Sequence, residues 1–207
     1  EPEDLSKILN EYLTQMSIIA LKYGGTIDKF IGDSIMIFFG DPETKGITED
    51  ARLCVMMAIE MRSSISSFHR RFPQAFSKPL DVRMGIHSGF CAVGSFGAEN
   101  RLEYTIIGGT VNLASRLEGL STPGGILLSS STYRYIKNTI ACKKYKNVTV
   151  KGIKAPVETY LVIDSHENLQ SMPNKIREEG DGYSVCIDLN LITPEKKKSL
   201  IDQLAST

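Results

Sequence analysis

The hydrophobic positions along the chain alternate between helical and strand spacing. Apolar residues recur every three or four positions over 5–19, which predicts a helix that ends at a glycine pair beginning with Gly24. A second stripe of the same kind over 48–68 predicts a longer helix. Between them, β-branched and aromatic residues predict a hairpin of two strands, 26–31 and 34–39, joined at a Gly-Asp corner.

The pattern continues with short elements as far as about residue 163. We expect strands at 80–89 and 90–97 joined at a Ser-Gly corner, an extended segment at 101–108, a helix entered through two glycines at 108–120, a strand at 124–130, a short helix at 131–138, and a closing pair of strands at 148–152 and 157–163. Helices interleaved with hairpin-connected strands predict an α+β sandwich, in which helices cover a mostly antiparallel sheet.

The last forty or so residues differ from the rest in their pattern. Residues 165–182 are polar and contain glycine, which predicts a linker, and they precede a strand at 183–192 and a helix at 193–207 with Thr193 as its N-cap. We therefore expect two parts, 1–165 and 166–207. A strand and a helix cannot be stable alone, so the second part should pack on the first or on a partner chain.

Composition narrows the class of protein. The chain has 207 residues, 42% of them hydrophobic, and equal numbers of basic and acidic side chains, 24 each, so its charge gives no reason to expect nucleic acid as a partner. Its four cysteines lack CxxC spacing, which favours reduced thiols in the cytoplasm. No apolar run is long enough to span a bilayer. The chain begins without methionine inside a helical pattern, which predicts a piece of a longer protein.

Four polar residues lie in places where the pattern needs an explanation. Lys29 and Asp33 lie within the apolar segment "TIDKFIGDSIMIFFG", where alternation places Lys29 on one face with two isoleucines. Taken alone, they indicate a lysine that reaches solvent and a turn aspartate. Asn112 and Arg116 stand one helical turn apart and have the chemistry to bind a sugar hydroxyl and a phosphate, although a solvated polar face is the simpler interpretation.

Taken together, four segments resemble the class III nucleotide cyclases, the catalytic domains of adenylyl and guanylyl cyclases. They are "DKFIGDSIMIFFG", "DVRMGIHSG", "EYTIIGGTVNLASRLEGL" and "VTVKG", and they occur in the family's order. The similarity runs from Glu1 to about Ile163. It implies a ferredoxin-like sandwich derived from a βαββαβ unit, and a homodimer whose two chains pack head to tail with active sites at their interface.

The resemblance also implies roles for seven residues and a metal cofactor. Each site would hold two Mg²⁺ or Mn²⁺ ions. The implied roles are a metal ligand for Asp33, base recognition for Lys29 and Thr105, ribose orientation for Asn112, contact with the reacting α-phosphate for Arg116, and binding of the other phosphates for Arg83 and Lys151.

The polarity of the base-reading pair favours ATP over GTP. Adenine presents an acceptor at N1 and a donor at N6, whereas guanine presents a donor at N1 and an acceptor at O6. Lys29 can only donate and Thr105 can accept, which fits adenine. Guanylyl cyclases carry an acidic residue at the lysine position. We therefore expect an adenylate cyclase that forms cyclic AMP and pyrophosphate in signal transduction; its Lys–Thr pair resembles a mainly microbial subset that includes bicarbonate-stimulated enzymes.

One feature of the family has no match. The first metal aspartate of the family lies in a motif like "FSDIxGFT" on a strand before the first helix, and nothing in this sequence matches it. We expect that a longer cyclase supplies this strand, and that sensor or regulatory domains lie upstream. The catalytic domain should be cytoplasmic, whether the parent protein is free or attached to a membrane.

Two alternatives stay open: a non-catalytic regulatory homologue, and a ferredoxin-like RNA-binding module, for which aromatic stacking positions and a basic face are not evident. His87 is expected to be a structural histidine satisfied by the backbone.

Overall fold

The computed structural model describes residues 2–72, 80–149, 156–170, 175–180 and 183–188, together with Thr193 and Lys196. The chain divides into two compact units, Glu1–Ser165 and His166–Thr207. Each unit is described by itself below. Among the described residues, no helix is long and apolar enough to cross a membrane.

A sheet of four strands forms the centre of the first unit. Its order is β3 (Met84–Ile86), β6 (Ile126–Ser129), β8 (Thr159–Ser165) and β7 (Ile140–Lys144). β3 and β6 are parallel, whereas β6 pairs antiparallel with β8 and β8 antiparallel with β7. The predicted α+β fold with a mostly antiparallel sheet is therefore confirmed.

The residues of β6 show how helices cover both faces of this sheet. Successive side chains of a strand point to opposite faces. Ile126 and Leu128 pack in a cluster with Val55 and Ile59 of α2 (Ile47–Arg71), while Leu127 packs with leucines of α3 (Gly109–Leu120) in a separate cluster. All four residues of the strand are buried. The layers are thus α2, the sheet and α3, and the short α4 (Ser130–Ile136) lies on the side of α2.

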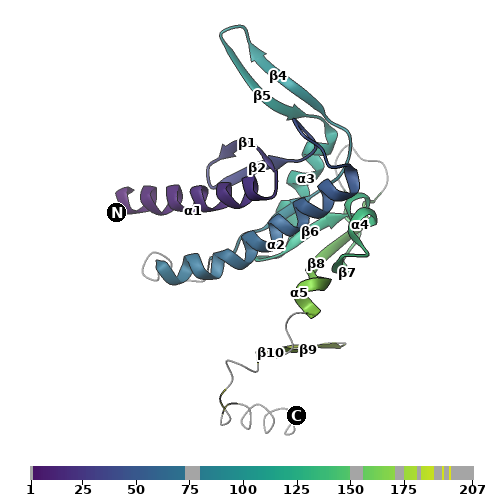
Figure 1. Ribbon diagram of the computed structural model, residues 1–207. Helices are drawn as coiled ribbons and strands as arrows, with labels where there is room; N and C mark the ends of the chain where they lie inside the picture. Colours follow the sequence, from purple (N-terminus) through teal and green to yellow (C-terminus); the bar gives the residue numbers. More distant parts are fainter. Residues whose placement is uncertain are drawn as a thin grey trace. The chain divides into compact units, whose positions relative to one another are not determined.

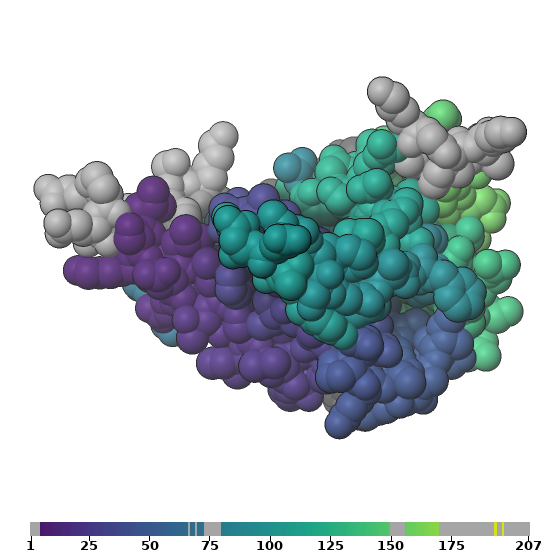
Figure 2. All heavy atoms as spheres, turned by 90° about the horizontal axis from the view of Figure 1, so that it is seen from above, coloured from purple at the N-terminus to yellow at the C-terminus, as the bar shows by residue number. Residues whose placement is uncertain are grey.

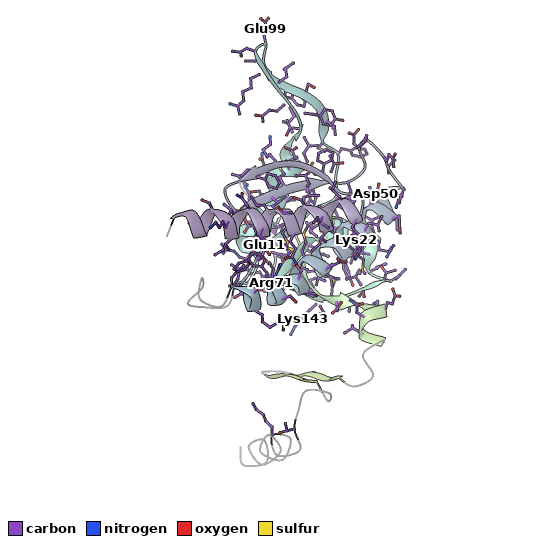
Figure 3. All side chains as sticks on the ribbon, turned by 60° about the vertical axis from the view of Figure 1, so that its left-hand side comes forward. Glu11, Lys22, Asp50, Arg71, Glu99 and Lys143 are labelled. Atoms are coloured by element: carbon purple, nitrogen blue, oxygen red, sulfur yellow. The ribbon has the colours of Figure 1, made fainter. Side chains whose placement is uncertain are left out.

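The first helix packs on the second. α1 (Pro2–Lys22) places Met16 and Ala20 against methionines and Ile65 of α2, and the two helices lie side by side in Figure 1. Two ion pairs join them, each involving the last residue of one helix: Glu11 to Arg71 at 2.5 Å, and Lys22 to Glu60 at 2.6 Å. Figure 3 shows Glu11 and Arg71 on neighbouring elements. Hydrogen bonds from Lys22 and Tyr23 lower the pKa of Glu60.

Two hairpins complete the first unit. β1 (Thr26–Ile31) and β2 (Ser34–Phe38) pair antiparallel, within one residue of the predicted bounds. β4 (Ala92–Ala98) and β5 (Arg101–Ile107) form a second hairpin, which projects from the body in Figure 1 and has Glu99 at its tip in Figure 3. Figure 2 looks down on this hairpin, whose teal atoms lie at the surface beside the purple and blue N-terminal elements.

Several predicted strands differ from the structure. The strand expected at 80–89 covers only Met84–Ile86, and it pairs with β6 and not with the following strand, so the Ser-Gly corner makes no hairpin. β7 was not predicted, because the lysines in "IACKK" weaken the alternation. Of the expected closing pair, the second strand is largely β8, which pairs with β6 and β7. The described part of the first strand meets it only at a bridge between Val148 and Val157, and residues 150–155 lie outside the described part.

The second unit contains more regular structure than its sequence suggested. The segment predicted as a linker includes α5 (His166–Gln170) and β9 (Lys175–Gly180), so that prediction was wrong. β9 pairs antiparallel with β10 (Tyr183–Asp188), which lies within the predicted strand. Four of the six residues of β9, "KIREEG", are charged, so no alternation of apolar residues marks the strand in the sequence. The backbone amide of Lys196 donates to Thr193 Oγ1 at 3.4 Å, which is the hydrogen bond that an N-cap residue accepts. Most of the predicted last helix lies outside the described residues.

Gly85 holds β3 unusually close to α3, and this contact generates the first prediction. A Cβ atom on Gly85 would lie 2.1 Å from the backbone nitrogen of Glu118 and 2.3 Å from the carbonyl oxygen of Ala114. Gly85→Ala should therefore lower the free energy of unfolding by about 2 kcal/mol or more, because backbone must move to admit the methyl group. Gly119→Ala is the matched control: that position on α3 has open space, and alanine should stabilise the helix by up to about 1 kcal/mol. Chemical denaturation measures both, and a Gly85→Ala protein as stable as the wild type would contradict the contact.

Candidate active site

A bulge in β1 turns Asp28 into the protein. Ile27 pairs with Ile37 but Lys29 pairs with Met36, so one extra residue lies in β1 at this point. The expected alternation of Lys29 with two isoleucines on one face is therefore wrong: Ile27 packs against the core, whereas Ile31 is exposed. The side chain of Asp28 has 0% exposure.

The Asp28 carboxylate joins β1 to β5. Thr105 Oγ1 donates to it at 2.7 Å and 2.9 Å from its two oxygens, and the backbone amide of Ile106 donates to Oδ2 at 2.9 Å. Lys29 Nζ lies 3.1 Å from Oδ1. A buried carboxylate needs such partners, because an unpaired charge in the interior is strongly unfavourable.

Lys29 and Thr105, the predicted base-reading residues, lie in direct contact. Lys29 Nζ donates to Thr105 Oγ1 at 3.0 Å, although the two residues are 76 positions apart. The lysine side chain is 34% exposed and approaches Glu103 at 3.7 Å on its outer side, while Thr105 is 6% exposed. We refer to Asp28, Lys29 and Thr105 as the polar triad. Asp28 was missed by sequence reasoning, because simple alternation in β1 does not reveal the bulge.

α3 follows the triad directly along the chain. β5 ends at Ile107, and Gly108 turns the chain into the helix with a φ of 151°, a conformation that favours glycine. Leu113 and Leu117 are buried and anchor the helix to the sheet. The other side of α3 carries Asn112, which is exposed, and Arg116, which is half-buried.

The remaining predicted site residues come from three other places. Asp33 is exposed at the turn between β1 and β2, after Gly32 with a φ of 64°. Burial raises the pKa of Tyr12 on α1, and the negative charge of Asp33 raises it further to a smaller extent. Arg83 precedes β3, and its Nε lies 3.6 Å from a carboxylate oxygen of Glu118 on α3. Lys151 lies outside the described residues.

Comparison with known proteins decides the family. Residues 1–164 match the domain family described as "Adenylate and Guanylate cyclase catalytic domain". The chain belongs to this family. The match covers the whole first unit except its last residue, and it includes every element that carries the polar triad and the predicted residues of α3.

Relatives of this cyclase domain include both adenylyl and guanylyl cyclases. The crystal structure of the adenylyl cyclase CyaB from P. aeruginosa is 52% identical, with a TM-score of 0.78, over 80% of this chain and 85% of that one. The guanylyl cyclase Cya2 is 33% identical, with a TM-score of 0.75, over 81% and 84%. Adenylate cyclase 1 of Rhizobium meliloti (strain 1021) is 30% identical over 78% of this chain, which spans only 24% of that relative's length.

The described part of the cyclase domain supplies one candidate metal ligand and no complete metal site. Within it, no group of three or more His, Cys, Asp or Glu side chains is arranged to hold a metal ion. The carboxylate of Asp33 is a hard oxygen donor of the kind that Mg²⁺ prefers, and it is exposed to a ligand at the β1–β2 turn. Asp33 therefore fits as one ligand of such an ion.

His87 has a structural partner in the cyclase domain. Its Nδ1 lies 2.7 Å from Ser129 Oγ, and Ser129 in turn caps α4 by accepting from the backbone amide of Thr132. The partner is thus a side-chain hydroxyl and not the backbone group that we expected. Burial lowers the pKa of His87, which favours its neutral form.

The hydrogen bonds of Asp28 generate a stability prediction. Thr105→Val should lower the free energy of unfolding by about 1 to 3 kcal/mol, because the buried carboxylate loses a donor. Thr139→Val is the matched control, since Thr139 is an exposed residue whose hydroxyl donates to the carbonyl of Ile136, and it should cost less than about 1 kcal/mol. Urea denaturation compares the two. Equal losses of unfolding free energy in the two variants would show that the hydrogen bonds from Thr105 to Asp28 contribute no more than the single hydrogen bond of Thr139.

Proposed function

We propose that this cyclase domain converts ATP to 3′,5′-cyclic AMP and pyrophosphate in a signalling protein. The observation that carries the proposal is the contact between Lys29 and Thr105, which brings a donor and a hydroxyl together within the first unit. CyaB, at 52% identity, is an adenylyl cyclase and supports the same substrate class. The family match gives no support to an RNA-binding module.

Base selection follows from the polarity of these two groups. An ammonium group can only donate hydrogen bonds, so Lys29 suits the N1 acceptor of adenine. Thr105 accepts from the 6-amino group. Guanine would present its N1 donor to the lysine, and a site that leaves buried polar groups opposed discriminates by orders of magnitude.

The reaction is an in-line attack of the ribose 3′-oxygen on the α-phosphorus, with pyrophosphate as the leaving group. In this proposal Asn112 orients the ribose, and Arg116 meets the negative charge that develops on the α-phosphate oxygens, since a guanidinium is planar and permanently charged. Arg83 and Lys151 bind the other phosphates. Two Mg²⁺ or Mn²⁺ ions per site, with Asp33 as one ligand, would activate the 3′-hydroxyl and neutralise the triphosphate.

We infer that the active form is a homodimer with two sites across its interface. Apolar side chains are exposed on both hairpins, among them Phe30, Ile31, Leu102, Tyr104 and Ile107. A cluster of exposed apolar groups is typical of an interaction surface. Asp33 and Arg83 would act from one chain, and the polar triad with Asn112 and Arg116 would act from the other. A two-fold axis then completes two equivalent sites.

We place the domain in the cytoplasm. The three described cysteines, Cys54, Cys91 and Cys142, are free thiols. Burial raises the pKa of Cys54 and of Cys142 to about 12, so both stay protonated and unreactive. Reduced cysteines are typical of the compartment in which ATP is available for signalling.

A cyclase assay on the complete protein tests the activity and separates an enzyme from a non-catalytic homologue. The wild type should form cyclic AMP from ATP with a higher kcat/KM than it shows for GTP. Asp33→Ala should reduce turnover by more than about a hundredfold, because a metal ligand is lost. Glu158→Ala, which removes an acid from an exposed ion pair with Lys144, is the matched control and should keep the wild-type rate. Wild-type turnover in Asp33→Ala would refute the metal role of this residue.

Complementation tests the shared sites. Asp33→Ala and Arg116→Ala chains should each be inactive alone, because every site of either homodimer has one defect. A mixed dimer has one site with both defects and one with neither. Random mixing should restore roughly a quarter of wild-type activity, since half the dimers are mixed and each has one working site of two. If mass spectrometry confirms mixed dimers without any recovery, both residues serve the same site from one chain.

A further inference from the structure

The hydroxyl of Thr105 has almost all of its hydrogen-bonding capacity occupied. A hydroxyl group has one proton to donate and two lone pairs that accept. The Thr105 proton goes to the Asp28 carboxylate, and Lys29 Nζ donates to one lone pair at 3.0 Å. One lone pair is left. Thr105 can therefore present only an acceptor to a further ligand.

Asp28 is the group that imposes this polarity. A carboxylate accepts and does not donate, so it takes the Thr105 proton whenever the two are in contact. The backbone amide of Ile106 holds Oδ2 in place at 2.9 Å, and the 0% exposure of the side chain excludes water as a competing partner. The second oxygen, Oδ1, lies 3.1 Å from Lys29 Nζ and holds the ammonium beside the threonine.

We propose that Asp28 is a positioning residue for base selection, which fixes Thr105 as an acceptor and Lys29 as its neighbouring donor. This inference rests on the proposed function, in which the two groups meet the 6-amino group and N1 of adenine. Asp28 itself touches no part of the substrate. A purely structural role, in which the carboxylate only ties β1 to β5, is the alternative that an experiment must separate from it.

Asp28→Asn changes this polarity with little change of shape. Because the amide of Ile106 can only donate, the asparagine oxygen takes the place of Oδ2 and its amide nitrogen the place of Oδ1. That nitrogen lies 2.9 Å from Thr105 Oγ1 and donates to it, which fills the lone pair left for the base. It also faces the ammonium of Lys29, a second donor, at 3.1 Å.

The test compares ATP with purine riboside 5′-triphosphate, which is ATP without the 6-amino group, on the complete protein. Both nucleotides need Lys29, but only ATP needs the Thr105 acceptor. The ratio of kcat/KM for ATP to kcat/KM for the analogue should fall by about tenfold in Asp28→Asn. Asp28→Ala should lower the ratio similarly, because the released hydroxyl proton can turn toward the base. Thr105→Ser, which keeps the hydroxyl, should retain the wild-type ratio.

Two failures are distinguishable. A wild-type protein that converts neither nucleotide would overturn the proposed function, and this inference with it. An active wild type in which Asp28→Asn and Asp28→Ala lower kcat/KM for both nucleotides by the same factor would overturn the inference alone, because a structural defect affects both substrates equally. Glu158→Gln serves as the control and should leave the ratio unchanged. Circular dichroism and the dimer mass confirm that each variant is folded.

Discussion

The buried carboxylate of Asp28 determines how the hairpins of this domain are placed. A charge without exposure must be matched by donors, and here the donors come from the neighbouring hairpin, through the side chain of Thr105 and the backbone of Ile106. Breaking such a set leaves an uncompensated charge, which is strongly unfavourable. β1 and β5 therefore stay together, and Lys29 is held where it meets Thr105.

The packing of the sheet and its helices fixes the elements that carry this contact. β6 separates two cores, with Leu127 facing α3 and its neighbours facing α2, so the sheet fixes both helices at once. Gly85 lets the sheet approach the backbone of α3 closely. The helix that carries Asn112 and Arg116 thus begins at the end of β5 and is packed against β3. Residues expected to handle base, ribose and phosphate share one rigid support, which is what positioning in phosphoryl transfer requires.

Sequence reasoning predicted the elements with strong local signals and missed those without them. The β1–β2 hairpin was found to within one residue, because β-branched side chains flank a glycine whose φ is 64°. β7 and β9 were missed, since their lysines, arginine and glutamates hide strands that depend on partners far along the chain or on a local ribbon. The Lys29–Thr105 pair came from the family resemblance, as spacing cannot relate residues 76 positions apart. Neither the hydrophobic pattern nor the family resemblance identified Asp28, because a bulge reverses the face on which it lies.

The location of the triad within one chain also bears on the proposed homodimer. Lys29 and Thr105 meet inside a single protomer, so both proposed base-reading groups come from one chain. Asp33 belongs to the same hairpin as Lys29, but it lies at the turn, four residues on from the lysine and exposed, whereas the triad is sheltered between β1 and β5. In the proposed function, Lys29 meets the base of one nucleotide, whereas Asp33 holds a metal ion at the triphosphate of another. A two-fold axis between identical chains would give each nucleotide a Lys29 from one protomer and an Asp33 from its partner, as the proposed homodimer requires.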